Sequence, residues 1–468
     1  MKTLIYSFCC LLLLFFSSCN QTKTNSIDET DNNQLNELKG KELWEVMKYG
    51  LFVHYVYGEE YGLMTPMSIN GGEPKDINEF TKVFDVEKFA DDVVSMGFEY
   101  VIFTAWHANM NLLYPSPVMT KWRGQEHTSE RDLLGELYEA LNKRGIYLCL
   151  YTHIWVGNDF HPKGDGYFYY GNKNGVITDD QKATGYVESV NGDSKKWNQF
   201  VGEVYDEMSA RYGDKIVAYW FDGTWTGAVD KKMIMETINK HNPSTAHIAN
   251  GTLDHGMPYA SKEIGHGVVN DFNKDGFNIV RDDVKTWAAY DRNIAIIQGG
   301  NWWASPNGGP QYTAEHVYQY TVLQAGTTNN GGVSWAFSPF ADNGWEKNVM
   351  ETMKKAYAYL KPVEKAIKKT KFSTAYPTEE GATINSLEHG FVATMSLDGN
   401  IHYIHVLRHP DSNELILPKA KDNSKFNKAS LLPGGDDVMI EKHGEGYKLT
   451  LPGGHKWDQL NTVIQLEK

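Results

Sequence analysis

Hydrophobic residues along most of the chain follow two alternating patterns. Short apolar runs rich in β-branched and aromatic residues are separated by longer segments whose apolar positions have helical spacing. The predicted strands are residues 51–55, 100–105, 147–152, 216–221, 246–249, 294–297 and 333–337, with a weaker one at 268–270. The predicted helices are 86–96, 133–143, 197–212, 231–241 and 314–325. This alternation favours a parallel sheet, and we expect an α/β fold with a (β/α)8-like barrel; a doubly wound sheet is the alternative.

The pattern changes after a predicted helix at 346–360. Short alternating segments bounded by Gly, Pro and Asp follow it, at residues 390–397, 402–406, 429–432, 447–451 and 462–466. Such segments are typical of antiparallel strands joined by tight turns. We therefore expect a barrel over residues 37–365 and a C-terminal antiparallel β-sandwich over 370–468.

The amino terminus has the pattern of a secretion signal. Lys2 precedes an apolar run at 11–16, and two serines then lead to Cys19. The run is too short to span a membrane. Small residues before a Cys resemble the lipobox of bacterial lipoproteins, although an ordinary signal with an incidental Cys has the same pattern. We expect a signal peptide at 1–18, a lipidated Cys19 and tether at 19–36, and anchoring in the bacterial cell envelope on the periplasmic or outer-membrane surface.

Composition narrows the set of partners. The formal net charge of -14 disfavours nucleic acid as a partner, and the aromatic content of 13% suits the stacking of rings on sugar faces.

After the signal and the lipidated position, Cys149 is the one remaining cysteine, in an apolar run typical of a buried structural residue. No spacing typical of metal ligands is present, so we expect no metal and no cofactor. The oligomeric state is not predicted.

Polar and aromatic residues gather where the predicted strands end, which is where barrel enzymes build their active sites. These candidates are His54, Tyr55, Trp106, His107, Tyr151, His153, Asp222, Trp225, Asn250, Trp302 and Trp303. Asp222 ends an apolar strand and precedes Gly223, so it is placed either as a nucleophile for an anomeric carbon or as the amino cap of the next helix.

Several segments, in order along the chain, resemble glycoside hydrolase family 29, the α-L-fucosidases. WEVMKYGLFVHYVY at 44–57 is similar to the family's first-strand motif, and YVIFTAWH at 100–107 is similar to its second strand with a His-His ending. RDLLGEL at 131–137 and WFDG at 220–223 match the next helix and the nucleophile motif, and the segment from Val406 to Ile464 resembles the family's β-sandwich.

The resemblance implies a retaining exo-glycosidase with Asp222 as nucleophile. It also implies that His54, Tyr55, Trp106, His107, Tyr151 and Trp225 contact the sugar. The family's first-strand Trp is Tyr55 here, and the first His of its pair is Trp106, so the resemblance implies an altered pocket.

The acid/base position varies within the family. Glu263 is the candidate acid/base, because its separation from Asp222 along the sequence is about that seen in one branch of the family. The alternative is that Glu263 is a solvated carboxylate in a loop. Near the segment where another branch has its acid, the closest polar residue is Gln298. Four further candidates are Asp282, Asp283, His255 and His266.

Three functions are consistent with these residues. The first is hydrolysis of terminal α-L-fucosyl residues from glycans by double displacement. The second is a glycosidase of altered specificity, acting on a substituted or different sugar or internally on a fucose-containing polysaccharide. The third is a glycan-binding lipoprotein without catalysis.

Overall fold

The computed structural model describes residues 38–58, 74–107, 110–154, 194–224, 229–251, 256–264, 291–329, 331–379 and 382–468. The predicted signal, Cys19 with its tether, the weak strand at 268–270 and Trp225 lie outside these ranges. Within them, each helix is too short or too polar to cross a bilayer.

Eight parallel strands close into a barrel, each paired with the next along the chain and the last paired with the first. They are β1 (Tyr49–Val53), β2 (Tyr100–Thr104), β3 (Tyr147–His153), β4 (Ile216–Asp222), β5 (Ala246–Asn250), β6 (Tyr259–Ile264), β7 (Asp291–Ile297) and β8 (Gly332–Ala336). The predicted barrel is confirmed, and the doubly wound alternative is wrong. Inside it, the rings of Phe52, Tyr151 and Trp220 pack at centroid distances of 5.1 to 5.8 Å. The interior is therefore a filled core beneath the strand ends.

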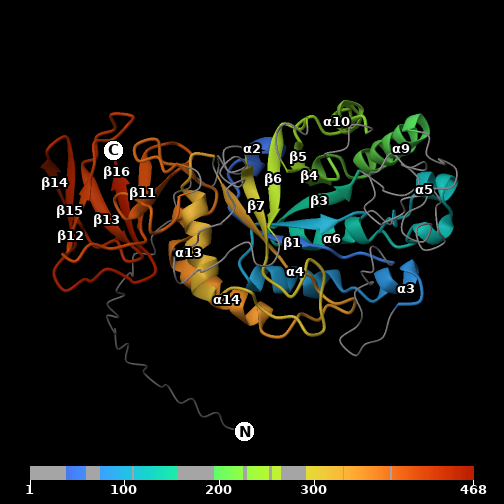
Figure 1. Cartoon of the computed structure of the whole chain (residues 1–468), viewed down its shortest axis with the longest axis horizontal. Helices are drawn as coiled ribbons and strands as arrows, with labels where there is room; N and C mark the ends of the chain where they lie inside the picture. Colours follow the sequence, from blue (N-terminus) through green and yellow to red (C-terminus); the bar gives the residue numbers. More distant parts are fainter. Residues whose placement is uncertain are drawn as a thin grey trace, which may run out of the picture. The chain divides into compact units, whose positions relative to one another are not determined.

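Helices surround this barrel (Figure 1). They are α2 (Gly40–Trp44), α3 (Ile77–Lys82), α4 (Val86–Ser95), α5 (Pro117–Trp122), α6 (Leu133–Asn142), α9 (Ser194–Tyr212), α10 (Lys231–Asn239), α13 (Ala314–Ala325) and α14 (Val349–Leu360), with short 3-10 turns η1 (Gln125–His127), η2 (Gly213–Lys215) and η4 (Lys361–Ala366). Side-chain caps fix several starts: Asp85 accepts from the backbone of α4, Asp132 from α6, and Asp230 from α10. All five helices predicted between the strands are confirmed.

Residues of each barrel strand point alternately inward and outward, as strand geometry requires. In β1, the side chains of Leu51 and Val53 pack in the layer between the barrel and the helices, whereas Phe52 packs in the barrel interior. Cys149 is buried in the interior, as predicted, and burial raises the pKa of its thiol. Beyond β1 the alternation continues, so that His54 lies on the inward side and Tyr55 packs in the outer layer.

The C-terminal part forms two antiparallel sheets, which confirms the predicted β-sandwich. The strands are β9 (Lys371–Phe372), β10 (Phe391–Met395), β11 (Ile401–Val406), β12 (Glu414–Leu417), β13 (Lys428–Leu432), β14 (Met439–His443), β15 (Gly446–Thr450) and β16 (Thr462–Glu467). One sheet has the order β13-β16-β11-β10-β9 and the other β12-β15-β14. The sequence missed β9, β12 and β14, while the limits 37–365 and 370–468 stay predictions.

The larger sheet buries both of its faces. Ile404 and Ile464 face the smaller sheet, whereas Tyr403 and Val463 join the cluster that also contains barrel helices. Beside them, the Asn461 side-chain amide donates to the Tyr318 hydroxyl on α13 at 3.0 Å. This hydrogen bond and the apolar packing of Tyr403 and Val463 hold the sandwich against the outer helical layer of the barrel.

Candidate active site

Four aromatic side chains from the first three strands form a cluster at the carboxyl end of the barrel. His54 follows β1, His107 follows β2, and Tyr151 and His153 end β3. The His54 ring lies 4.7 Å from the Tyr151 ring and 5.4 Å from the His107 ring. The His107 ring in turn lies 5.2 Å from the rings of Tyr151 and His153. The structure therefore brings together four of the strand-end candidates named from the sequence, His54, His107, Tyr151 and His153.

Asp222, the last residue of β4, points into this cluster. Its Oδ2 accepts a hydrogen bond from the Tyr151 hydroxyl at 2.7 Å and lies 3.7 Å from His153 Nε2. Its Oδ1 accepts from the backbone N–H of Gly223 at 2.7 Å. The amino cap of α10, the next described helix, is Asp230, so the cap alternative for Asp222 does not apply. What remains is a buried carboxylate at the strand end, held in place by its neighbours.

Opposing effects act on the ionisation of Asp222. Burial favours the neutral acid, but the nearby imidazoles of His153 and His107 and the hydrogen bonds from Asn250 and Tyr151 outweigh it. The net result is a pKa below the ordinary value for an aspartate. The group is therefore a carboxylate at neutral pH, which is the form required of a nucleophile.

Asn250, at the end of β5, connects Asp222 to Glu263. Its side-chain Nδ2 donates to Asp222 Oδ1 at 2.8 Å and lies 3.1 Å from Glu263 Oε2. Two oxygens so close to one nitrogen are at most about 6 Å apart, compared with about 5–5.5 Å between the carboxyl groups of retaining glycosidases and about 6.5–9.5 Å in inverting ones. The two carboxyl groups can therefore act on one glycosidic bond.

Glu263 belongs to a strand and not to a loop. It lies on β6, two residues beyond Ser261, which pairs with Asn250 of β5. Residues two apart on a strand face the same side, so Glu263 emerges toward the strand ends while staying partly exposed. A partly exposed carboxyl beside a buried nucleophile is arranged as a general acid must be, within reach of both the leaving group and water.

His54 is held as a neutral ring. Burial, together with the neighbouring His107, lowers its pKa well below the ordinary value. Its Nδ1 is buried and has no hydrogen-bond partner in the described part of the chain. A buried ring nitrogen without a partner is costly, and a hydroxyl of a bound sugar would satisfy it.

Two indole rings border His54 from the loop after β7. The Trp302 ring lies 5.6 Å from the His54 ring and the Trp303 ring 6.0 Å from it. The Ser338 hydroxyl accepts from the His54 backbone N–H at 2.8 Å and donates to the Trp302 carbonyl at 2.7 Å. Both indoles stay partly exposed, so they form an aromatic wall beside the histidine.

Tyr55 and Trp106 lie elsewhere, and their predicted sugar contacts are corrected. Tyr55 is fully buried, stacks on Phe80 at 4.1 Å, and its hydroxyl lies 3.0 Å from the Ala341 carbonyl. Trp106 is fully buried against Tyr205, with its Nε1 donating to the His153 carbonyl at 2.8 Å. Both side chains point outward, into the layer behind the site: Tyr55 continues the alternation of β1, whereas Trp106 follows Ala105 into the outer layer where the alternation of β2 has ended.

The other acid candidates divide into two groups. The amide of Gln298 donates to the Tyr312 carbonyl at 3.0 Å and accepts from the Tyr312 N–H at 3.1 Å, so it fixes a loop. Asp282, Asp283, His255 and His266, like the predicted sugar contact Trp225, lie outside the described residues. Among the described residues, Glu263 is the carboxyl group placed beside Asp222 through Asn250.

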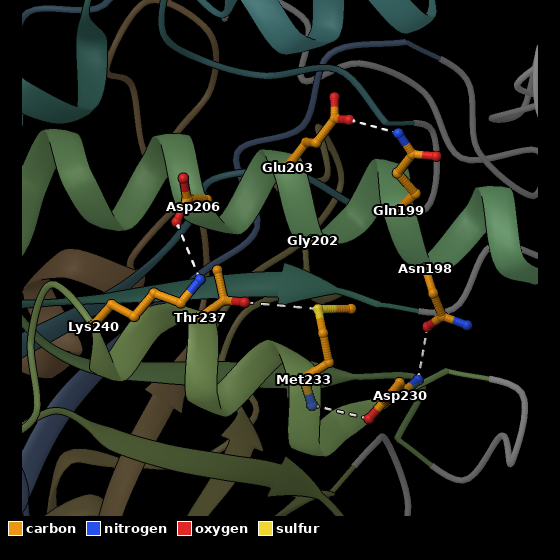
Figure 2. A pocket seen from close by; sticks show the side chains of 9 residues that line it. All are labelled: Asn198, Gln199, Gly202, Glu203, Asp206, Asp230, Met233, Thr237 and Lys240. Atoms are coloured by element: carbon orange, nitrogen blue, oxygen red, sulfur yellow. Dashed lines mark hydrogen bonds and ion pairs between the residues drawn. The ribbon is translucent and has the colours of Figure 1, made fainter.

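A groove of about 420 Å³ lies apart from these residues, between α9 and α10 (Figure 2). Its polar side chains interact with each other: Gln199 donates to Glu203 at 2.9 Å, and Lys240 approaches Asp206 at 4.0 Å. Its walls are outer-layer helices and none of the strand-end residues lines it, so the candidate active site is the strand-end cluster.

No group of three or more His, Cys, Asp or Glu residues is arranged to hold a metal ion in the ranges that the structure describes. The described side chains of the strand-end cluster supply acid, base and nucleophilic groups. The pair that can carry out this chemistry is Asp222 and Glu263, with His54, His107 and Tyr151 beside them.

Comparison with known proteins points to one family. The sequence profile described as Alpha-L-fucosidase matches residues 75–277. Human tissue alpha-L-fucosidase is 31% identical over 150 residues, which are 31% of this chain and 27% of the human protein. A putative alpha-L-fucosidase of Caenorhabditis elegans is 26% identical over 155 residues, which are 32% of this chain and 27% of that protein. The matched segment thus spans about a quarter of each relative.

Solved structures agree in fold over most of the chain. The GH29 alpha-L-fucosidase of Bacteroides thetaiotaomicron has a TM-score of 0.61 at 19% identity, covering 91% of this chain and 94% of that one. Alpha-L-fucosidase isoenzyme 1 of Paenibacillus thiaminolyticus has a TM-score of 0.62 at 18% identity, covering 91% and 97%. These likenesses establish the shared architecture. The profile match and the sequence relatives make this chain similar to the α-L-fucosidases, glycoside hydrolase family 29, at low identity.

Proposed function

We propose that this protein is a retaining exo-glycosidase that removes terminal α-L-fucosyl residues from glycans. The observation that carries the proposal is the hydrogen-bonded series Asp222, Asn250, Glu263 at the ends of three neighbouring strands. It provides an ionised nucleophile and a partly exposed second carboxyl group at a spacing suited to double displacement.

In the first step, the Asp222 carboxylate attacks the anomeric carbon while the bond to the leaving oxygen breaks. Glu263 gives its proton to that oxygen, and a glycosyl ester of Asp222 remains. In the second step, Glu263 takes a proton from water as the water oxygen attacks the same carbon. The ester bond breaks, Asp222 leaves as a carboxylate, and Glu263 is again protonated.

The surrounding side chains suit a sugar ring at this place. Neutral His54 has a free ring nitrogen for a hydroxyl, and the Tyr151 hydroxyl fixes Asp222 for attack. Trp302 and Trp303 offer apolar faces to the C–H groups of the ring. A filled barrel beneath the cluster favours attack on a terminal residue that enters from the open end.

The test is hydrolysis of an aryl α-L-fucoside, followed by NMR of the first sugar anomer released. Wild-type protein should release the α anomer, and Asp222→Gly should lose on the order of 10³ or more in kcat. Added azide should restore turnover of Asp222→Gly with β-fucosyl azide as product, because azide replaces the missing nucleophile. With Glu263→Ala, azide attacks the glycosyl enzyme and should give the α azide instead.

Asp132→Asn is the matched control, because Asp132 also accepts from a tyrosine hydroxyl, that of Tyr212, and from a glycine N–H, that of Gly135. This variant should keep full activity. Release of the β anomer first would refute double displacement. A well-folded wild type without turnover would refute fucosidase activity and favour the two other hypotheses, another sugar or binding without cleavage.

We also propose that the protein is anchored to the bacterial cell envelope through acylated Cys19. The support is the signal pattern and the serines before Cys19. Growth with an alkynyl fatty acid should label the wild type and the control Cys149→Ala, but not Cys19→Ala. Equal labelling of Cys19→Ala would refute the anchor.

A further inference from the structure

A buried carboxylate lies beneath the loop that carries Trp302 and Trp303. Glu346, between β8 and α14, is 5% exposed. Its Oε2 accepts the backbone N–H of Gly300 and its Oε1 that of Ser305, both at 2.6 Å. One side chain from the neighbouring barrel loop thus holds the main chain on both sides of the two indoles.

Glycines let the loop approach this carboxylate closely. A Cβ added to Gly308 would overlap the carboxylate of Glu346, and one added to Gly299 or Gly300 would lie 3.1 or 3.2 Å from its oxygens. The neighbouring Gly309 differs, because a Cβ there would meet only Lys347 O at 3.4 Å, an ordinary contact. The loop is therefore fitted around Glu346 at particular glycines.

The two ends of the loop are also joined. Gln298 forms two hydrogen bonds with the backbone of Tyr312, and the Gln311 N–H donates to the Gln298 carbonyl at 2.9 Å. The Trp302 carbonyl accepts from Ser338. The loop is thus tied at its two ends, at Trp302 and at the two N–H groups that Glu346 accepts, with its rings beside His54.

We propose that Glu346 is a positioning residue that holds Trp302 and Trp303 against His54 and so preforms the aromatic wall of the sugar site. This inference rests on the proposed function. A wall ordered before binding spares the ligand the entropy of ordering it, so loss of Glu346 should weaken binding more than it slows the chemical step.

The first variant is Glu346→Gln, whose amide can accept only one of the two N–H bonds and directs its NH2 toward the other. We expect KM for an aryl α-L-fucoside to rise about tenfold with kcat changed by less than about threefold. Hydrogen exchange should accelerate in residues 298–312. Gly308→Ala keeps the carboxylate but displaces it, so it should reproduce both effects, whereas Gly309→Ala should show neither.

Glu99→Ala separates the positioning of the loop from the stability of the barrel. Glu99 is also buried, and its Oε2 accepts two backbone N–H groups, those of Lys48 and Tyr49 at 2.9 and 3.0 Å, at the amino-terminal end of the barrel; alanine is used because a glutamine oxygen could keep both bonds. It should lower the denaturation midpoint and leave KM unchanged. If Glu346→Gln failed to fold, the Gly308→Ala and Gly309→Ala pair would decide.

Unchanged KM in Glu346→Gln or Gly308→Ala, in active protein, would overturn the inference, as would unchanged exchange in residues 298–312. A tenfold KM rise in Glu99→Ala would also overturn it, because the effect would then be one of general stability. If the wild type lacked turnover, the proposed function would fail by itself. Exchange in residues 298–312 would then still decide whether Glu346 holds the loop.

Discussion

Removal of the Asn250 amide should disable the candidate site without unfolding the barrel. Asn250→Ala deletes the hydrogen bond to Asp222 Oδ1 and the contact with Glu263 Oε2. Asp222 keeps its bonds from Tyr151 and Gly223, so its carboxylate stays buried and only partly satisfied. The variant thus tests whether the two carboxyl groups act as a connected pair.

The size of the effect follows from the bond that is lost. A hydrogen bond to a charged group contributes about 1.5–3 kcal/mol. If that contribution is made fully in the transition state, kcat/KM should fall about 10- to 100-fold, because about 1.4 kcal/mol corresponds to a factor of ten. The pKa of Asp222 should rise, because burial raises this pKa and one of the hydrogen bonds that lower it is lost. The acidic limb of the pH profile should move upward with it.

The assay is kcat/KM for an aryl α-L-fucoside measured across acidic and neutral pH. Asn242→Ala is the matched control, because Asn242 is equally buried and donates to the carbonyls of Gly213 and Ile216 at 3.1 and 3.0 Å, near the start of β4. The control should lose stability and keep kcat/KM. A folded Asn250→Ala with kcat/KM within about threefold of wild type and an unmoved acidic limb would refute the reasoning.

Three further predictions concern single side chains. Tyr55→Phe should cost about 1–2 kcal/mol in urea unfolding and leave KM unchanged, because a buried hydroxyl beside two carbonyls is lost; a raised KM would return Tyr55 to the sugar site. His153→Asn should raise the pKa of Asp222, because the imidazole 3.7 Å from its carboxylate is lost, and the acidic limb of the kcat/KM profile should move to higher pH. An acidic limb at the same pH as in the wild type would show that His153 does not lower this pKa. Burial lowers the pKa of His405 to about 4, so the unfolded chain binds a proton first as pH falls below about 6.5. The free energy of unfolding should therefore fall by about 3 kcal/mol for this residue between pH 6.5 and 4, and His405→Gln should flatten that slope.

Apolar periodicity was sufficient for most of the architecture, because most elements bury a regular face. The helix at 314–325 was predicted at its observed limits, and its Thr313 cap is visible in the sequence. The sandwich strands Lys371–Phe372, Glu414–Leu417 and Met439–His443 escaped prediction. The last of them is mostly exposed and carries the charged Glu441 and Lys442, so no alternation distinguishes it from a loop.

The sixth barrel strand was missed because it carries the site. Tyr259–Ile264 places Ser261 and Glu263 on its inward face, where an ordinary barrel strand has aliphatic residues. The strand lacks the usual aliphatic pattern because its inward residues belong to the candidate site. For this reason the sequence predicted that Glu263 lies after the fifth strand and not on a sixth. The role of Asn250 was missed for a related reason: its two partners come from different strands.

The observed side-chain positions change how the differences from the family motif should be interpreted. Tyr55 continues the alternation of β1, in which Phe52 faces inward and Val53 outward. After β2 the alternation is broken, because Ala105 and Trp106 both pack in the outer layer while His107 faces the cluster. Both substituted positions therefore lie in the outer layer, where Tyr55 contacts the Ala341 carbonyl and Trp106 donates to the His153 carbonyl. These substitutions therefore change the support behind the site and not the surface that meets a sugar, so they give no reason to expect a different sugar.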